Sequence, residues 1–412
     1  MNLAWLSLIA LIVAIVVSCF TRLNVGILGL ASAWIVGVYF GGMGLNDILA
    51  GFPTQLFLTL VGVTLLFSQA HLNGTLDKLA LRAVSLCRGN VGLIPVMYFL
   101  LGAAIATMGP GNIATAAMLA PMAMATAARA GVPLFLMAIM VGNGAQAGAL
   151  SPFAPTGIIV NGIMERIGLG GYEFRTYLAG FAGHAIVAFG GYLLFGGWRL
   201  FTRTYAGGDD EAAKGSTDFD RKNVITMATI GAVLLSVLFV GANVGMAAFA
   251  GAVLLAVFGV ADHEQAVKRM PWFVIVMVCG VTVLIALMEK TGGLDLFTRF
   301  LAYMATEETA TGVVAFVTAV VSVYSSTSGV VLPAFLPTVP GLVMRIGGDP
   351  IAIASAMNVG AHLVDMSPLS TTGAMCLTGI TDTKDVRPVY NRLLAWGASM
   401  TVVGAILCWI MF

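Results

Sequence analysis

Long apolar runs dominate the chain, and most are close to the length that a membrane-spanning helix requires. A helix needs about 20 apolar residues to cross a hydrocarbon core about 30 Å thick. In the first half, the runs of this kind cover roughly residues 3–20, 25–41, 54–70, 133–165 and 177–198. In the second half, they cover roughly residues 223–241, 243–260, 272–288, 350–380 and 391–411. The pattern predicts an all-α integral membrane protein.

Two further apolar segments are interrupted at their centres by residues that end helices. The segment 92–128 contains Gly109-Pro110-Gly111-Asn112, and the segment 312–345 contains Ser325-Ser326-Thr327-Ser328-Gly329. Each pattern predicts a helix, a tight turn and a second helix, which we interpret as a re-entrant hairpin. Two ordinary crossings joined by a short uncharged loop are the alternative interpretation.

The runs 133–165 and 350–380 contain too many helix-breaking residues to form single straight helices. Each is predicted to be a broken helix with two half helices. The breaks are expected at residues 142–146 and 151–152 in the first run, and at 358–360 and 367–368 in the second. A half helix of about nine residues covers about half of the hydrocarbon core, so the breaks are expected near the bilayer midplane.

The second half of the chain repeats the first. Residues 151–157 (SPFAPTG) and 367–373 (SPLSTTG) share four of seven positions, and residues 62–77 align without gaps to residues 280–295 with seven identities in sixteen. A duplicated membrane chain that is broken at matching points is typical of secondary transporters. We therefore expect two repeats of about five transmembrane helices and one hairpin each. Their boundaries are 1–198 and 223–412, with a hydrophilic linker at 199–222.

Charge and composition agree with this topology. The chain is 59% hydrophobic and only 9% charged, and its net charge of +1 gives no indication of nucleic-acid binding. Five crossings per repeat make the second repeat inverted. Fifteen of the 20 Lys and Arg residues then fall on the side of the linker, which predicts a cytoplasmic linker and both termini outside the cell inner membrane.

Polar residues at the interruptions are the candidate ligands. Helix N-termini favour anions, whereas exposed carbonyls and side-chain oxygens favour a hard cation such as Na⁺. No Lys or Arg falls at a predicted midplane position, so an anion would be neutralised by helix termini, hydroxyls, amides and a co-bound cation. Capping of local backbone is the alternative role for these residues. The candidates are Asn112, Asn143, Asn358, Thr156, Thr371, Thr372, Ser326, Thr327 and Ser328.

Asp365 is the only acidic residue within a predicted membrane segment, and His362 lies one turn before it. An intramembrane carboxylate is expected to be functional, by binding a coupling cation or by titrating, although capping the break is an equal alternative. His184, on an apolar helix, is expected to be a packing residue. The sequence shows no HExxH motif and no membrane Ser/His pair, so we do not expect an enzyme.

At these residues the chain resembles the divalent anion/sodium symporter family, and within it the MatC-type dicarboxylate carriers. The resemblance covers essentially the whole chain and is strongest at residues 109–114, 137–145 and 148–159. It implies a homodimer with a static scaffold and a transport unit that moves as an elevator. It also implies Na⁺-coupled symport of a C3–C4 dicarboxylate such as malonate, succinate or fumarate. A cation/proton antiporter or a metalloid anion exporter on the same scaffold is the alternative, and no resident cofactor is expected.

The resemblance also implies the binding residues. Asn112 matches the Asn of the family's Ser-Asn-Thr tip motif, whereas Gly111 and Ile113 depart from it, and the second tip keeps its hydroxyls without the Asn. The substrate-binding residues implied are Gly111, Asn112, Ser151, Thr156, Ser326, Thr327, Ser328, Ser367, Thr371 and Thr372. The Na⁺ ligands implied are Gly109, Asn112, Asn143, Gly144, Ser325, Ser328, Asn358, Gly360 and Asp365.

Overall fold

The computed structural model describes residues 2–21, 23–205, 218–380 and 382–412, so most of the predicted linker lies outside the described residues. Apart from one β-bridge between Asn90 and Thr204, the regular elements of this part of the chain are helices. Seven of them are long and apolar enough to cross a membrane, and six shorter helices are apolar as well. These features confirm the prediction of an all-α, multi-pass membrane protein.

The first half consists of helices of unequal length, the longest of which is α10 with 22 residues. Its elements are α1 (Leu3–Phe20), α2 (Val25–Trp34) with the π-helical turn η1 (Ile35–Phe40), α3 (Leu45–Leu49), α4 (Thr54–Leu72), α5 (Thr75–Ser85), α6 (Leu93–Met108), α7 (Gly111–Ala130), α8 (Leu134–Ala147), α9 (Pro155–Arg166), α10 (Glu173–Leu194) and η2 (Gly197–Thr202). The chain is helical because backbone groups in an apolar environment must find partners within their own segment.

The second half follows the same order of elements. They are α11 (Arg221–Val240), α12 (Val244–Val257), α13 (His263–Lys268), α14 (Trp272–Thr291), α15 (Gly293–Tyr303), α16 (Ala310–Tyr324), η4 (Thr327–Val331), α17 (Leu332–Phe335), η5 (Leu336–Thr338), α18 (Val339–Ile346), α19 (Pro350–Leu363), η6 (Val364–Met366), α20 (Thr371–Thr378) and α21 (Thr383–Met411). Helix α14 begins 218 residues after α4, and α20 begins 216 residues after α9.

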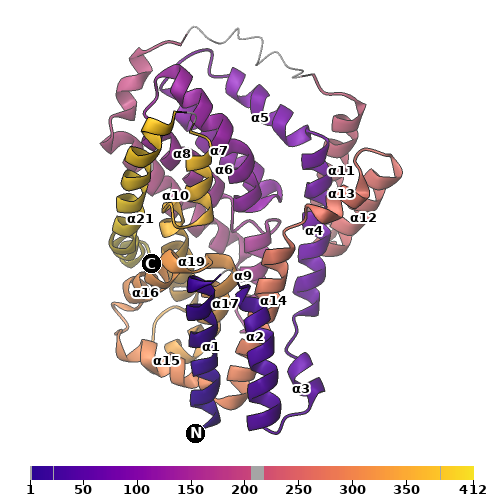
Figure 1. Cartoon of the computed structure of the whole chain (residues 1–412), viewed down its shortest axis with the longest axis vertical. Helices are drawn as coiled ribbons and strands as arrows, with labels where there is room; N and C mark the ends of the chain where they lie inside the picture. Colours follow the sequence, from indigo (N-terminus) through magenta and orange to yellow (C-terminus); the bar gives the residue numbers. More distant parts are fainter. Residues whose placement is uncertain (1, 22, 206–217, 381) are drawn as a thin grey trace.

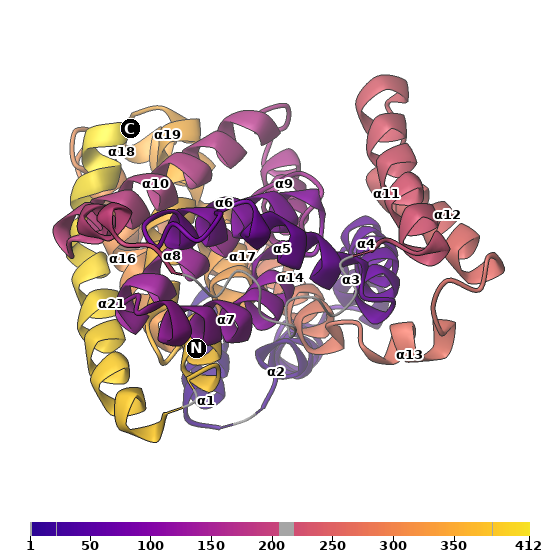
Figure 2. The same ribbon diagram turned by 90° about the horizontal axis from the view of Figure 1, so that it is seen from above.

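The helices pack as two groups. We call α1, α2, α4, α11, α12 and α14 the frame helices, and α6, α7, α8, α10, α16, α19, α20 and α21 the core helices, because contacts within each group are extensive. Figure 2 shows α11 and α12 beside α4 on one side of the molecule, with α21 and α16 on the other. The groups meet where α9 packs on α4 and where η4 and α17 pack on α14.

Two glycine-mediated crossings hold the frame helices together. Gly26 of α2 lies against the backbone of α14, and a Cβ at Gly280 would fall on the backbone of Gly26. Likewise, a Cβ at Gly62 of α4 would lie 2.5 Å from the carbonyl oxygen of Gly245 in α12. Small residues allow such close backbone approach in membrane helices. Each crossing joins a helix of the first half to a helix of the second half. The second helix of the first half (α2) meets α14, and its counterpart in the second half (α12) meets α4.

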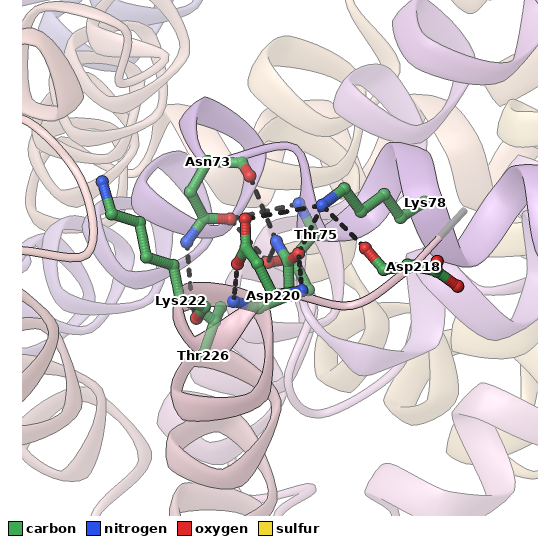
Figure 3. A network of polar contacts seen from close by, with 8 residues as sticks. Asn73, Thr75, Lys78, Asp218, Asp220, Lys222 and Thr226 are labelled. Carbon is green, nitrogen blue, oxygen red and sulfur yellow. Dashed lines mark hydrogen bonds and ion pairs between the residues drawn. The ribbon is translucent and has the colours of Figure 1, made fainter. Parts of the chain in front are cut away.

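An amphipathic helix follows the third long helix of each half. Figure 1 shows α5 near the top of the view and α15 near the bottom. The start of α5 is fixed to the start of α11 by a polar junction, in which Lys78 Nζ donates to Oδ1 of Asn223 at 2.7 Å (Figure 3). Asn223 Nδ2 donates to the carbonyl oxygen of Asn73 at 3.2 Å and to Oγ1 of Thr75 at 3.0 Å. Lys78 also lies 3.5 Å from the Asp220 carboxylate.

The breaks in the long helices agree with the prediction at residues 151–152 and 367–368 and differ from it at 142–146 and 358–360. Helix α8 continues to Ala147, so the first interruption covers residues 148–154 instead of 142–146. Helix α19 continues to Leu363, and the chain passes through η6 and residues 367–370 before α20 begins. Asn143 and Gly144 therefore lie inside α8, and Asn358 and Gly360 lie inside α19, which corrects their predicted placement at breaks.

Both predicted hairpin segments contain a turn between two helices. Helices α6 and α7 are joined at Gly109-Pro110 and pack against each other. In the second segment, α16 ends at Tyr324, and Ser325 and Ser326 lead into η4. By length and composition alone, Gly111–Ala130 and Thr327–Ile346 are long enough to cross a membrane, so the re-entrant path of both segments stays a prediction.

Replacing Asn223 by Ala should destabilise the protein, because the buried Asn223 side chain (0% exposed) satisfies groups of both α5 and α11. Leaving such partners unsatisfied costs about 1–3 kcal/mol. We expect the melting temperature of Asn223→Ala in detergent to fall below that of Asn243→Ala, which removes only a local bond to Met246 N. Equal melting temperatures for the two variants would contradict the role of the junction.

Acidification should weaken the ion pair that joins α15 to α18. The hydrogen bond from Arg345, aided by Arg299 at 2.8 Å, holds the pKa of Asp295 below its ordinary value of about 4. A depressed pKa stabilises the fold above that ordinary value, and the contribution disappears as the pH falls through the lower, folded value. The difference in melting temperature between wild type and Asp295→Asn should therefore shrink between pH 7 and pH 3. A difference that is constant across this range would refute the ion-pair contribution.

Candidate functional site

A chain of side-chain hydrogen bonds crosses the middle of the molecule. Asn112, the second residue of α7, donates from Nδ2 to Oε1 of Gln146 in α8 at 2.8 Å. Gln146 donates from Nε2 to Oδ2 of Asp365 in η6 at 2.8 Å, and Thr327 of η4 donates from Oγ1 to the other carboxylate oxygen at 2.7 Å. We call these four residues the central network. It joins the turn after α6, helix α8, the second interruption and the turn after α16.

The central network is enclosed by the surrounding helices. Gln146 is 1% exposed, Thr327 is 5% exposed, and Asn112 and Asp365 are each 6% exposed. Longer contacts extend it, from Thr156 Oγ1 to Asn112 Oδ1 at 3.4 Å and from the Ser370 hydroxyl to Asp365 Oδ1 at 3.3 Å. Because buried polar groups are stabilising only when they are paired, the network fixes the relative positions of these segments.

Asp365 receives hydrogen bonds only from neutral donors, the Gln146 amide and the hydroxyls of Thr327 and Ser370. No Lys or Arg forms an ion pair with it among the residues that the structure describes. A buried carboxylate without a cationic partner is costly to keep charged. The site can therefore lower its energy by taking up a cation or a proton. No cluster of three or more His, Cys, Asp or Glu side chains suited to a metal ion occurs in the described ranges.

A cavity of about 270 Å³ lies beside the central network, and we call it the hydroxyl cavity. Its other walls come from the α1–α2 connection and from the start of α14, including Phe273 and Met277. Ser325 borders it with a buried Oγ that has no hydrogen-bond partner. Ser18 and Thr21 line it from the side of α1, and the other Asn, Asp, Ser and Thr residues that line it are Asn112, Ser325, Ser326, Thr327, Ser328, Asp365, Ser370, Thr371 and Thr372.

Two helix N-termini reach the hydroxyl cavity. Asn112 and Ile113 belong to the first turn of α7, and Thr371 and Thr372 to the first turn of α20. Backbone N–H groups in a first turn have no partner within the helix and carry a partial positive charge. Together with the hydroxyls, they form a surface that suits the carboxylate of a small anion.

A second cavity of about 340 Å³ lies on the other side of the Gly109-Pro110 turn, and we call it the Arg269 cavity. It is bordered by α4, by Gly109-Pro110 and by the start of α9, and its walls are mostly apolar. Asn112 and Ser328 border both cavities, so they lie between them. A third hollow of about 940 Å³ is lined by α9 and the ends of α4 and α14, and contains Glu165, Arg166, Glu173, Glu289 and Lys290.

The structure brings most of the predicted substrate residues to these two cavities. Gly111, Asn112, Thr156, Ser326, Thr327, Ser328, Thr371 and Thr372 line one or both of them, and so do Gly109, Ser325 and Asp365 of the predicted cation set. Ser151 and Ser367 line neither cavity. Ser151 instead donates to the carbonyl oxygen of Thr107 at 2.7 Å, and the Ser367 hydroxyl accepts from Leu369 N at 3.3 Å.

The four predicted cation ligands inside α8 and α19 lie apart from the central network. Asn143 accepts a hydrogen bond from Nδ1 of His184 at 2.9 Å and donates to the carbonyl oxygen of Ile139 at 2.9 Å. Asn358 is fully buried, and its side chain has no hydrogen-bond partner among the described residues. Gly144 and Gly360 lie against the backbone of Phe99 and of Ala315. Their surroundings are those of closely packed helix interiors.

Three residues of the central network or of the two cavities, Gln146, Ser370 and Arg269, were absent from the sequence prediction. Gln146 is a single amide in a Gly/Ala-rich run, and its polarity within a buried helix is the one signal that could have identified it. Arg269 precedes α14 and borders the cavity named after it, although the sequence placed it among the basic residues of the linker side. No local sequence pattern indicates that Arg269 lies near Gly109.

The apolar helices fit an α-helical, multi-pass membrane protein, and the cavities beside the central network are its candidate site. Residues 1–149 match the family model described as the N-terminus of the dicarboxylate carrier protein MatC. The match covers Asn112 and Gln146 and ends just after α8. It supports a MatC-type dicarboxylate carrier and agrees, over these residues, with the resemblance found in the sequence. A comparison with curated proteins found no match.

Replacing Gly109 by Ala should distort the first turn. Gly109 has a φ of 143°, and a Cβ there would fall on the ring of Phe67 in α4. Gly168 is a matched control, because it has a φ of 80° and a Cβ there would meet nothing within 4 Å. Backbone strain is about 1 kcal/mol for Gly168→Ala, whose φ lies near the left-handed region, and it is larger for Gly109→Ala, whose φ lies outside that region. The clash should add about 1–3 kcal/mol to Gly109→Ala alone. Equal melting temperatures for the two variants would contradict the close contact between the turn and α4.

Proposed function

We propose that this protein is a secondary active transporter of C3–C4 dicarboxylates such as malonate, succinate or fumarate. The observation that supports this function best is the convergence of two helix N-termini, a hydroxyl cluster and the buried Asp365 on one small cavity. The match of residues 1–149 to a dicarboxylate carrier family supports the substrate class. A carrier family also favours transport over catalysis.

In this proposal, the substrate binds between the two turns. The first turns of α7 and α20 and the hydroxyls of Ser326, Thr327 and Ser328 hold one of its carboxylates. Thr156, Thr371 and Thr372 contribute further hydroxyls from the starts of α9 and α20. Asn112 is the pivotal contact, because it borders both cavities and is held in place by Gln146 at 2.8 Å.

We propose that Na⁺ is the coupling ion and that it enters with the substrate. Among the described residues, the carboxylate of Asp365 has no basic partner, and the nearby Ser325 hydroxyl is buried and unpaired. Oxygen ligands of this kind suit Na⁺, which would offset the negative charges of Asp365 and of the substrate. Binding of the cation and of the anion would then favour each other, which is the physical basis of symport.

We further propose that the halves are inverted repeats and that transport follows an elevator mechanism. The exchanged glycine crossings, Gly26 with Gly280 and Gly62 with Gly245, are what a two-fold axis in the membrane plane would produce. The frame helices would form the static scaffold of a homodimer, and the core helices would carry the site across the membrane. The positive-inside rule supports an inner-membrane protein with a cytoplasmic linker and external termini.

A cation/proton antiporter or a metalloid anion exporter is the second candidate. It is favoured by one observation, the buried carboxylate of Asp365 with only neutral donors around it. Asp365→Asn should then abolish cation exchange, while the wild-type protein should neither bind nor transport dicarboxylates. Dicarboxylate uptake by the wild type would exclude this candidate as the main function.

Uptake of labelled malonate and succinate into proteoliposomes tests the proposed function. We expect uptake that depends on an inward Na⁺ gradient, and at least about a tenfold loss of uptake in Asn112→Ala, because a buried polar contact is worth about 1–3 kcal/mol. Ser399→Ala, at an exposed position of α21, should behave like wild type. The proposal fails if neither compound is taken up under a Na⁺, K⁺ or proton gradient.

A further inference from the structure

An unpaired guanidinium borders the Arg269 cavity. Arg269 is the residue that follows α13, two positions before Pro271 and the start of α14. Its side chain is exposed and has no ion-pair partner among the described residues, whereas the adjacent Lys268 pairs with Glu264 at 2.6 Å. The guanidinium of Arg269 can therefore bind a ligand from solvent. It lies on the segment that connects the frame helices α12 and α14.

The cavity that Arg269 borders contains no opposing charge. Among the described residues that line it there is no Asp or Glu, and Phe67, Ile105 and Met118 make much of its wall apolar. Thr115 also borders the cavity, is fully buried, and has an Oγ1 without a hydrogen-bond partner. An unpaired cation and an unpaired buried hydroxyl beside one cavity both favour an anionic ligand that would satisfy them.

The larger hollow beside α9 differs in charge. It is bordered by three acidic side chains, Glu165, Glu173 and Glu289, and by two basic ones, Arg166 and Lys290. An anion in that hollow would meet a net negative charge, whereas an anion in the Arg269 cavity would meet a positive one. Both hollows are lined by α4 and α9. The charge of their walls is net negative in the larger hollow and positive in the Arg269 cavity.

We propose that Arg269 binds one carboxylate of the transported dicarboxylate in the Arg269 cavity, and that Thr115 donates its hydroxyl to the same ligand. This inference rests on the proposed function and deepens it, because it assigns a specificity-determining contact to a frame segment outside the two turns. The planar guanidinium can hold a carboxylate through two parallel hydrogen bonds. A second carboxylate near Asn112, at the inner end of the cavity, would make the site select dianions over monoanions.

Transport kinetics of full-length variants in proteoliposomes test this assignment. The probes are labelled succinate, a dianion at pH 7, and labelled monomethyl succinate, a monoanion. For Arg269→Gln we expect a KM for succinate at least about tenfold higher than that of wild type, with kcat changed less than twofold. The preference for succinate over the monoester should fall by a similar factor. Arg269→Lys should restore part of the affinity, because it keeps the charge without the bidentate geometry.

Lys268→Gln is the matched control, since it removes the same charge one residue away and lines neither cavity. It should keep the wild-type KM. The wild-type KM for succinate should also rise between 20 and 500 mM ionic strength, more steeply than that of Arg269→Gln, because salt screens an exposed charge. This wild-type measurement tests the proposal even if Arg269→Gln does not fold.

Three outcomes separate the hypotheses. An Arg269→Gln variant with the KM and anion preference of Lys268→Gln would overturn the assignment of Arg269 and leave the proposed function intact. A wild-type KM that is independent of ionic strength would overturn it as well. A wild-type protein that transports no dicarboxylate would overturn both the assignment and the proposed function.

Discussion

The side-chain amide of Gln146 is the bridge on which the central network depends. It accepts from Asn112 and donates to Asp365, both at 2.8 Å, and so connects the first turn to the second interruption. Interrupted helices in an apolar environment leave backbone and side-chain groups that must find partners within the protein. Without this bridge, the buried carboxylate of Asp365 would lose the amide donor that Gln146 supplies. Gln146 thus links the first turn, through α8, to the second interruption, and Thr327 links the second turn to the same carboxylate.

The frame around this centre is set by close backbone contact. Gly26 with Gly280 and Gly62 with Gly245 allow two helix pairs to approach more closely than any larger side chain would permit. In lipid there is little hydrophobic driving force between helices, so tight packing of this kind supplies much of their association. The same crossings position α4 and α14, on which the interrupted segments rest. A rigid frame and a polar centre are thus linked through α9, η4 and α17.

Much of the fold was predictable, because apolar length and helix-breaking residues act locally. The turn at Gly109-Pro110 and the starts of α9 at Pro155 and α20 at Thr371 lie where the Pro, Gly and hydroxyl residues indicated. The prediction of breaks at 142–146 and 358–360 was wrong, because glycine and asparagine have two uses in membrane helices. Gly142 and Gly144 permit contact with Met366 and Phe99, and Asn143 is satisfied by His184. Only the packed structure separates these uses.

The candidate site was predictable in its types of residue but not in its connections. Hydroxyls beside an apolar turn indicated Ser326, Thr327 and Ser328, yet nothing in the sequence indicated that Thr327 lies 2.7 Å from the Asp365 carboxylate. Arg269 lies far along the chain from Thr115, and their proximity to one cavity arises from the packing of α13 and α14 beside the first turn. Contacts between segments of such separation require three-dimensional information.

The central claim is that a small dicarboxylate binds between the two turns, where Asn112 and Ser328 separate the two cavities. The most direct measurement is an electron cryo-microscopy map of the protein in lipid nanodiscs with saturating malonate and Na⁺. We predict ligand density in contact with Asn112 and with the hydroxyls at 326–328 or 371–372. Ligand density outside both cavities, or an empty site at a malonate concentration that saturates transport, would contradict the claim.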